Sequence, residues 1–134
     1  MLEAETMRGL ERSAHCGRLT EADAGDRVVL MGWVQTRRDH GGLIFLDLRD
    51  RSGVVQVVCD PEKAAAFAKA REIRSEYVLA VGGTVTRRPE GTENQALPTG
   101  RVEVRADDLR VLNTSRTPPF YIEDGVEVEE TVRL

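Results

Sequence analysis

The chain has 134 residues, of which 40% are hydrophobic and 31% charged, and this suits one soluble folded domain with its own core. No apolar run approaches the ~20 residues of a membrane span and no signal-peptide core opens the chain, so we expect a cytoplasmic protein that contacts no membrane. The net charge of −4 excludes a generic nucleic-acid binder with a basic surface on every side. Any nucleic-acid contact must therefore be a local patch.

The basic residues and the two cysteines further limit the kinds of binding site that the chain can form. Of the 19 basic residues 17 are arginine, the type suited to bidentate and stacking contacts, although genome composition explains the same bias equally well. Cys16 and Cys59 do not make a disulfide framework, and without a secretion signal we expect both to be reduced thiols. His15 and Cys16 are too few ligands for a metal site, so we expect no metal.

Composition divides the chain into three parts. We expect residues 1–12 to be an N-terminal extension, residues 13–116 to be the folded domain, and residues 117–134 to be a linker. The linker begins beside two consecutive prolines, and proline cannot continue a central strand. Five acids and one base in residues 123–134 account for the whole net charge.

Two turn signals, Asp39–Gly42 and Asp50–Gly53, predict three consecutive antiparallel strands, the first from about Val28 to Arg38. Gly32 indicates a bulge or sharp bend in the first strand, as a small closed barrel requires. Counting outward from four-residue turns sets the register, although a slip of one residue would exchange the two faces. The predicted pairs are Arg38 with Leu43, Thr36 with Phe45, Phe45 with Val58, and Asp47 with Gln56.

Because side chains alternate along a strand, each of these strands has two different faces. The apolar face, expected to be core, holds Ile44, Leu46, Leu48, Val55, Val57 and Cys59. The opposite face holds Arg38, Phe45, Asp47, Arg49 and Gln56. An aromatic ring on an otherwise polar face suits stacking on an unpaired base while its neighbours read the base edge. The alternatives are that Phe45 packs under another element and that Arg38 and Gln56 are ordinary surface groups.

The second half of the chain predicts one helix and two more strands. Asp60 as N-cap and Pro61 at the first position open a helix to about Ile73. Ala64, Phe67, Ala68 and Arg71 are predicted to lie along one side of this helix. The fourth strand is predicted at Tyr77–Val85, followed by a polar loop over Arg87–Thr99. The fifth is predicted at Gly100–Arg105, continuing through Leu109–Leu112. The fold class is therefore all-β with one helix: a five-stranded Greek-key OB-fold (oligonucleotide-binding) barrel with the helix between strands three and four.

The sequences of the predicted strands also resemble those of a known family. The runs Gly32–Asp50, Gly53–Val58 and Thr99–Val104 resemble the N-terminal anticodon-binding domain of bacterial aspartyl-tRNA synthetases, which are class II enzymes. The resemblance covers about residues 13–134, and the related asparaginyl and lysyl enzymes share the barrel but not this wording. It implies that the partner is the anticodon stem-loop of tRNA, with no DNA expected.

The resemblance also implies a complete enzyme: an aspartate–tRNA ligase, a homodimer that attaches aspartate to tRNA(Asp). Its ATP and Mg would bind in a catalytic domain that begins just beyond the end of this chain. We therefore expect the 134-residue chain to be inactive alone and to need no cofactor.

The family's binding roles carry over to positions that match its motifs. Phe45 would stack on the central uridine of the anticodon, with Arg38 and Gln56 contacting its edge and a nearby phosphate. Arg88 and Glu103 match positions near the first anticodon base, and the loop holding Asn94 approaches the last. Thr36 departs from the arginine common in relatives, which removes one expected phosphate contact.

Two further positions concern specificity. His40 and Gly91 resemble the residues of relatives that charge both tRNA(Asp) and tRNA(Asn), whereas strict enzymes tend to carry Leu and Lys there. The two tRNAs differ at the last anticodon base, so the resemblance implies relaxed specificity. The alternative for His40 is a loop residue that makes no contact with tRNA. The alternative for Arg88 and Glu103 is a simple cross-strand ion pair.

Two other functions remain open on the sequence. A sequence-tolerant single-stranded nucleic-acid-binding OB module would need several exposed aromatics, and only six of 134 residues are aromatic. A protein-interaction barrel would bind its partner without Phe45. Catalysis by the chain itself is not expected, because no nucleophile accompanies Asp39, Asp47 and Asp50.

Overall fold

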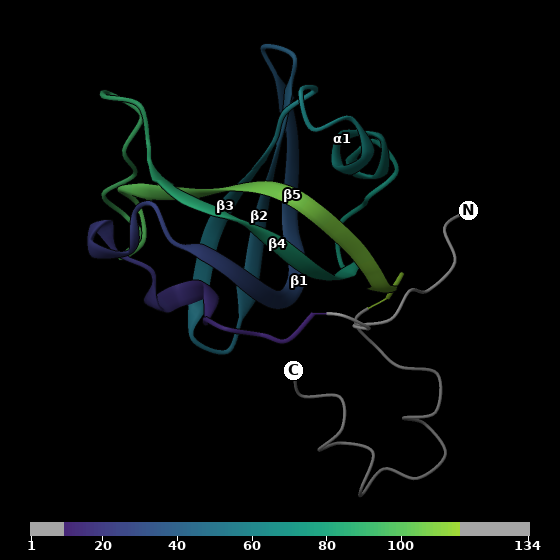
Figure 1. Cartoon of the computed structure of the whole chain (residues 1–134), viewed down its shortest axis with the longest axis horizontal. Coiled ribbons are helices and arrows are strands. Elements are labelled where there is room, and N and C mark those ends of the chain that lie inside the picture. The colour runs from purple at the N-terminus through teal and green to yellow at the C-terminus, as the bar shows by residue number, and fades with distance from the viewer. Residues whose placement is uncertain (1–9, 116–134) are drawn as a thin grey trace, which may run out of the picture.

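The computed structural model describes residues 10–115, which form a closed barrel with one α-helix packed against it (Figure 1). The elements are the 3-10 segments η1 Cys16–Arg18 and η2 Glu21–Asp23, the strands β1 Arg27–His40, β2 Leu43–Asp50, β3 Gly53–Cys59, β4 Val78–Arg87 and β5 Val102–Asn113, and the helix α1 Ala64–Ala70. Neighbouring strands follow the order β1-β2-β3-β5-β4, and β4 closes on β1. The predicted five-stranded OB-fold barrel, with its helix between strands three and four, is confirmed.

The core follows the alternation of β2 and β3. The side chains predicted to face inward are at most 2% exposed: Ile44, Leu46, Leu48, Val55, Val57 and Cys59. Full burial of such a side chain contributes roughly 1.5–3 kcal/mol. The outward face of the same two strands is thereby left to the mixed set around Phe45. Within residues 10–115, no helix is long and apolar enough to cross a membrane.

The predicted register holds for one hairpin and fails for the other. Phe45 lies opposite Val58, as predicted. In the first hairpin, Arg38 lies opposite Phe45, and the predicted pairing with Leu43 is wrong by two residues. The reason is the turn: Gly41 and Gly42 form a two-residue loop with φ of +60° and +83°, tighter than the four-residue turn assumed. A shift of two residues keeps every side chain on its predicted face.

The irregularity predicted in β1 is present but lies further along the strand. The register shifts between Val34 and Thr36, so Gln35 is the extra residue of a bulge. Gly32 instead allows β1 and the backbone of Arg49 to approach closely, because a Cβ at this position would lie 2.4 Å from the carbonyl oxygen of Arg49.

The helix begins later than the sequence predicts. Asp60 caps a turn: its carboxylate accepts a hydrogen bond from the Glu62 N–H (2.9 Å), and its carbonyl accepts one from the Lys63 N–H (2.9 Å). The helix starts at Ala64, after this turn, so the predicted start at Pro61 is wrong.

Only one side of α1 packs against the barrel. The buried residues are Ala66 and Ala70, followed by Ile73 beyond the helix, and they pack over β3 and β5 with Phe67. Ala64, Ala68 and Arg71 are exposed. They lie on another side of the helix from Ala66 and Ala70, because a helix turns by about 100° per residue.

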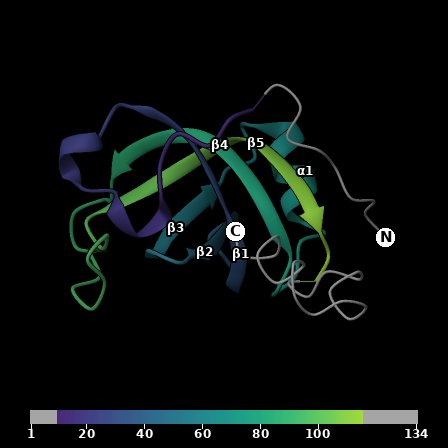
Figure 2. The same cartoon turned by 90° about the horizontal axis from the view of Figure 1, so that it is seen from below.

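The last two strands have 10 and 12 residues, close to the predicted lengths, and the predicted continuation of the fifth strand is confirmed. β4 extends to Arg87, and β5 is one continuous strand because register shifts at Val78/Leu79 and Gly82/Gly83 absorb the break in alternation. The 88–101 connection follows β4 and lies at the end of the barrel away from α1 (Figure 2). The predicted linker 117–134 and most of the predicted extension 1–12 lie outside the described residues.

The segment before β1 is tied to the β2–β3 turn by a cluster around Asp50, which we call the Asp50 cluster (Cys16, Gly17, Asp50 and Ser52). The carboxylate of Asp50 accepts from the Cys16 N–H (2.8 Å), the Ser52 N–H (2.8 Å) and the Ser52 hydroxyl (2.5 Å). The Gly17 N–H donates to the Ser52 hydroxyl oxygen (2.7 Å). The backbones meet so closely that a Cβ on Gly17 would lie 2.1 Å from the Ser52 carbonyl oxygen.

Candidate nucleic-acid interface

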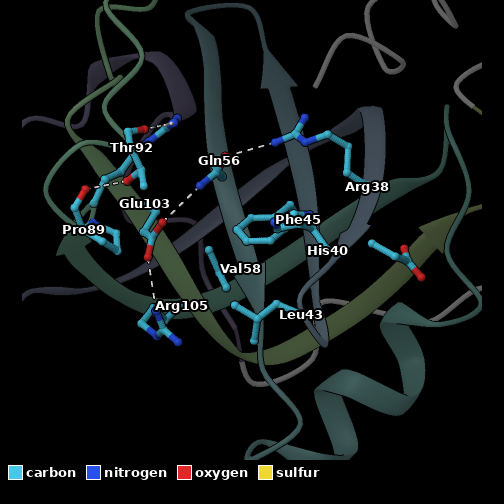
Figure 3. Close-up of a pocket in the computed structure, with 12 residues that line it drawn as sticks. Arg38, His40, Leu43, Phe45, Gln56, Val58, Pro89, Thr92, Glu103 and Arg105 are labelled. Carbon is cyan, nitrogen blue, oxygen red and sulfur yellow. Dashed lines mark hydrogen bonds and ion pairs between the residues drawn. The ribbon is translucent and has the colours of Figure 1, made fainter.

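A groove of about 620 Å³ opens on the outward face of β1, β2, β3 and β5, with the 88–101 connection as one wall (Figure 3). The groove is lined by Arg38, Asp39, His40, Leu43, Phe45, Gln56, Val58, Arg88, Pro89, Thr92, Glu103 and Arg105. Strand register arranges its floor in two rows of side chains, each crossing the strands.

The first row, which we call the Phe45 row, runs Arg38, Phe45, Val58, Arg105 from β1 to β5. Directly opposed side chains on neighbouring strands are about 5 Å apart at Cβ, so the row is continuous. Phe45 is half-buried, and the guanidinium carbon of Arg38 lies 5.9 Å from the centre of its ring. The row is a short apolar strip with a cation at each end.

The second row, which we call the Gln56 row, runs Thr36, Asp47, Gln56, Glu103 across the same strands. Its groups are joined by hydrogen bonds: the Gln56 amide donates to Glu103 Oε1 (3.0 Å), and Arg38 donates to Gln56 Oε1 (3.1 Å) and to Asp47 (2.8 Å). Thr36 donates its hydroxyl to Asp47. Figure 3 shows Gln56 between Arg38 and Glu103, beside the ring of Phe45.

The polar centre of the groove is buried. Gln56 is 7% exposed and Glu103 only 3%. A buried carboxylate needs partners for both oxygens, and here the second oxygen accepts from Arg105 (3.2 Å). Arg105 also donates to Asp60 (3.0 Å), at the end of β3. The result is a connected set of polar groups from β1 to the turn before α1.

Arg88 supports the wall of the groove. Its guanidinium donates to the carbonyl oxygens of Val102 (3.2 Å) and Thr92 (3.3 Å), joining the start of β5 to the loop. Burial lowers the pKa of Arg88, while the nearby charge of Glu103 acts to raise it. Pro89 and Thr92 of this loop line the groove.

The structure brings six of the eight predicted site residues together on the groove: Arg38, His40, Phe45, Gln56, Arg88 and Glu103. Gly91 and Asn94 are not among the lining residues. Gly91 is exposed on the loop, with φ of +88°. Asn94 lines a separate cavity of about 170 Å³, and its side-chain oxygen accepts from the Ala96 N–H (2.9 Å). The roles assigned to both remain predictions.

Six lining residues were not among the predicted site residues: Asp39, Leu43, Val58, Pro89, Thr92 and Arg105. Val58 follows from the register, because it lies opposite Phe45 in the pairing already predicted. Arg105 also had a signal, since it lies two residues after Glu103 in a strictly alternating strand and therefore shares its face. The position of Thr92 depends on the path of a loop, and no sequence pattern indicated it.

The part of the chain that the structure describes holds neither a metal-binding cluster nor a reactive thiol. Within residues 10–115 no three His, Cys, Asp or Glu side chains are arranged to hold a metal ion. Both cysteines are free and buried. Burial raises the pKa of Cys59 to about 12 and that of Cys16 further still, so neither thiol ionises near neutral pH.

Comparison with known proteins places the chain in a family. Residues 28–112 match the tRNA anticodon family, described as an OB-fold nucleic acid binding domain. The chain belongs to this family. In this OB-fold domain the groove lies on the face of strands two and three, where OB-folds commonly bind oligonucleotides.

The relatives of the domain confirm the resemblance found in the sequence. An aspartate–tRNA(Asp/Asn) ligase from Moorella thermoacetica is 63% identical over 134 residues, which are 100% of this chain and 22% of that protein, in its N-terminal part. A second such ligase, from Heliobacterium modesticaldum, is 64% identical over 94% of this chain and 21% of its own length. The chain thus spans about a fifth of the length of the curated relatives it matches.

A solved structure shares the fold. The asparaginyl-tRNA synthetase of Pyrococcus horikoshii superposes with a TM-score of 0.65 and 31% identity, over 81% of this chain and 24% of that one. The barrel is therefore the fold that a longer synthetase of this group carries as one part.

Proposed function

We propose that this OB-fold domain binds the anticodon loop of a tRNA as the N-terminal domain of an aspartate–tRNA ligase. The observation that carries the proposal is the pair of parallel rows in the groove: an apolar strip with an arginine at each end, beside a line of hydrogen-bonding groups. A single-stranded loop offers the matching chemistry, since each base has an apolar face and a polar edge and is flanked by phosphates.

In the proposed complex, one base of the loop stacks on Phe45 and its edge meets the Gln56 row. Base–aromatic stacking contributes roughly 1–3 kcal/mol per base. The Gln56 amide uses one N–H and one oxygen lone pair within the protein, so one donor and one acceptor remain for a ligand. This suits uracil, whose edge presents an N–H beside a carbonyl oxygen.

Affinity in this arrangement comes from a local field, since the whole chain is acidic. Arg38, Arg88 and Arg105 line the groove together with two carboxylates, Asp39 and Glu103. The cations at the groove attract phosphates, and binding should therefore weaken steeply with salt. Arg38 is half-exposed beside Phe45 and is the best placed of the three to meet a phosphate while the ring holds the base.

The wider assignments rest on the relatives. The complete protein would attach aspartate to tRNA(Asp) and tRNA(Asn), as the names of the relatives state for them. It would use ATP and Mg in a separate catalytic domain, act as a homodimer and work in the cytoplasm. His40 lines the groove and Gly91 lies on its loop wall, and in this proposal the two positions admit either last anticodon base.

Fluorescence titration with anticodon stem-loops tests the proposal. We expect the domain to bind the aspartate and asparagine loops and to bind poorly a loop whose central uridine is replaced. Binding of the aspartate loop alone would keep anticodon recognition and remove relaxed specificity. Equal binding of all three would instead favour a sequence-tolerant single-strand module. Absence of binding, with an intact fold by circular dichroism, would contradict the proposal.

A further inference from the structure

The orientation of the Gln56 amide is determined by the chemistry of its two neighbours. Glu103 has only acceptor oxygens when ionised, and Arg38 has only donors. The amide nitrogen must therefore point to Glu103 (3.0 Å) and the amide oxygen to Arg38 (3.1 Å). A glutamine amide turned by 180° has nearly the same shape, so without such neighbours it would present its donor and acceptor in either order.

Glu103 is itself held by residues outside the Gln56 row. Arg105 donates to its second oxygen (3.2 Å), and the other terminal nitrogen of Arg105 donates to Asp60 (3.0 Å). The Asp60 carboxylate is in turn fixed by the Glu62 N–H (2.9 Å) in the turn before α1. Four hydrogen bonds therefore link the backbone of this turn to the Gln56 amide. Figure 3 shows the last two, from Arg105 to Glu103 and from Gln56 to Glu103.

We propose that Arg105 and Asp60 are positioning residues that set base discrimination in the groove by holding Glu103 and, through it, the Gln56 amide in one orientation. The proposal rests on the function proposed above, because it specifies how that same groove reads a base. Uracil and cytosine present opposite orders of donor and acceptor on the edge that a fixed amide reads: a carbonyl and an N–H in uracil, an amino group and a bare nitrogen in cytosine. A fixed amide distinguishes them, whereas an amide free to turn accepts both.

The geometry favours positioning over direct contact of Arg105 with phosphate. Both terminal nitrogens of Arg105 already donate to carboxylates, so one cation sits between two anions. A phosphate would have to displace one of these carboxylates and approach the other. The two roles also predict different results, since loss of a phosphate contact weakens all sequences alike and lowers the salt slope by about 1.

The test compares Arg105→Leu with Arg27→Leu. Arg27 is a matched control, because it also pairs with a carboxylate (Asp107, 2.6 Å) but does not line the groove. We expect Arg105→Leu to reduce the preference for a central uridine over a central cytidine by about tenfold, the effect of one charge-assisted hydrogen bond. Arg27→Leu should leave the preference unchanged, and Arg105→Lys should restore part of it.

A second readout needs no RNA. In the wild-type domain the Gln56 side-chain amide protons should be shifted and slow to exchange in NMR spectra, and in Arg105→Leu they should move toward the position of an exposed glutamine. Unchanged Gln56 signals would overturn the proposal, as would an unchanged uridine preference or a uniform loss of affinity with a lower salt slope. If the wild type showed no preference at all, the proposed function would fail, and the NMR signals alone would decide whether Arg105 positions the amide.

Discussion

Two carboxylates of this barrel are equally buried and yet do different work. Asp50 and Glu103 are each 3% exposed. Asp50 accepts from two backbone N–H groups and one hydroxyl, all within the Asp50 cluster. Glu103 accepts only from side chains that the structure places around the groove, Gln56 and Arg105. The first carboxylate joins backbone to backbone, and the second joins side chain to side chain.

The difference teaches how one fold separates stability from recognition. Backbone donors cannot turn away without unfolding a segment, so a carboxylate that holds them contributes to the stability of the barrel. Side-chain donors are not part of the backbone ladder, so a carboxylate that holds them can set the orientation of a group that reads a ligand. Burial acts to raise the pKa of Asp50, yet its hydrogen bonds from Ser52 and Cys16 outweigh this and hold the pKa below its ordinary value of 3.8.

Of the predicted effects, removal of Asp50 should have the largest, and it should act on stability. We expect Asp50→Ala to lower the free energy of unfolding by about 2–4 kcal/mol, because the N–H groups of Cys16 and Ser52 lose their acceptor in a buried site. Urea denaturation measures the change. Asp107→Ala, which removes an exposed partner of Arg27, is the control and should change stability by under about 1 kcal/mol. Equal effects at the two positions would contradict the role given to Asp50.

On the recognition side, Phe45→Ala should weaken binding of an anticodon stem-loop by roughly 1–3 kcal/mol, since it removes the stacking surface. That is about 5- to 150-fold in Kd by titration. Phe67→Ala is the matched control: Phe67 packs from α1 against the core and does not line the groove. It should lower stability and leave Kd unchanged. A Phe45 variant with wild-type affinity would remove stacking from the proposal.

Lowering the pH should reduce the stability of the fold through protonation of Asp50, which separates its role from that of Glu103. Because its pKa is lowered in the folded state, the unfolded chain binds the proton more readily, so the stability it contributes is present above pH 3.8 and is lost as the pH falls through the folded value. Urea denaturation at about pH 6 and about pH 3 should therefore show a larger loss for the wild type than for Asp50→Asn. Parallel losses would show that Asp50 is not the group responsible.

The smallest expected effect concerns the specificity pair. His40→Leu with Gly91→Lys should shift the ratio of affinities toward the aspartate loop by about threefold to tenfold, less than loss of stacking, because contacts at exposed sites are weak. The φ of +88° at Gly91 strains any L side chain, so Gly91→Ala is needed as a control for the backbone. A ratio equal to that of the alanine control would count against both positions.

The face on which each strand residue lies could be predicted, because side chains alternate between the two faces of a strand. The β1–β2 pairing was wrong by two residues, yet Arg38 and Phe45 still share a face, since parity survives such a shift. The helix start failed because Asp60 and Pro61 satisfy a turn as well as a helix cap, and only packing decides between them. The same carboxylate of Asp60 then holds Arg105, a contact between residues 45 positions apart that no local pattern indicates.

The two-glycine turn of the first hairpin offers a way to observe the groove in operation. A Cβ built on Gly41 or Gly42 meets nothing within 4 Å, and both neighbours of the turn, His40 and Leu43, line the groove. The chain's two cysteines are buried with raised pKa values. A cysteine inserted between the glycines would therefore react selectively with a fluorescent dye. The dye would report occupancy of the groove from its rim, making the domain a sensor for its own ligand.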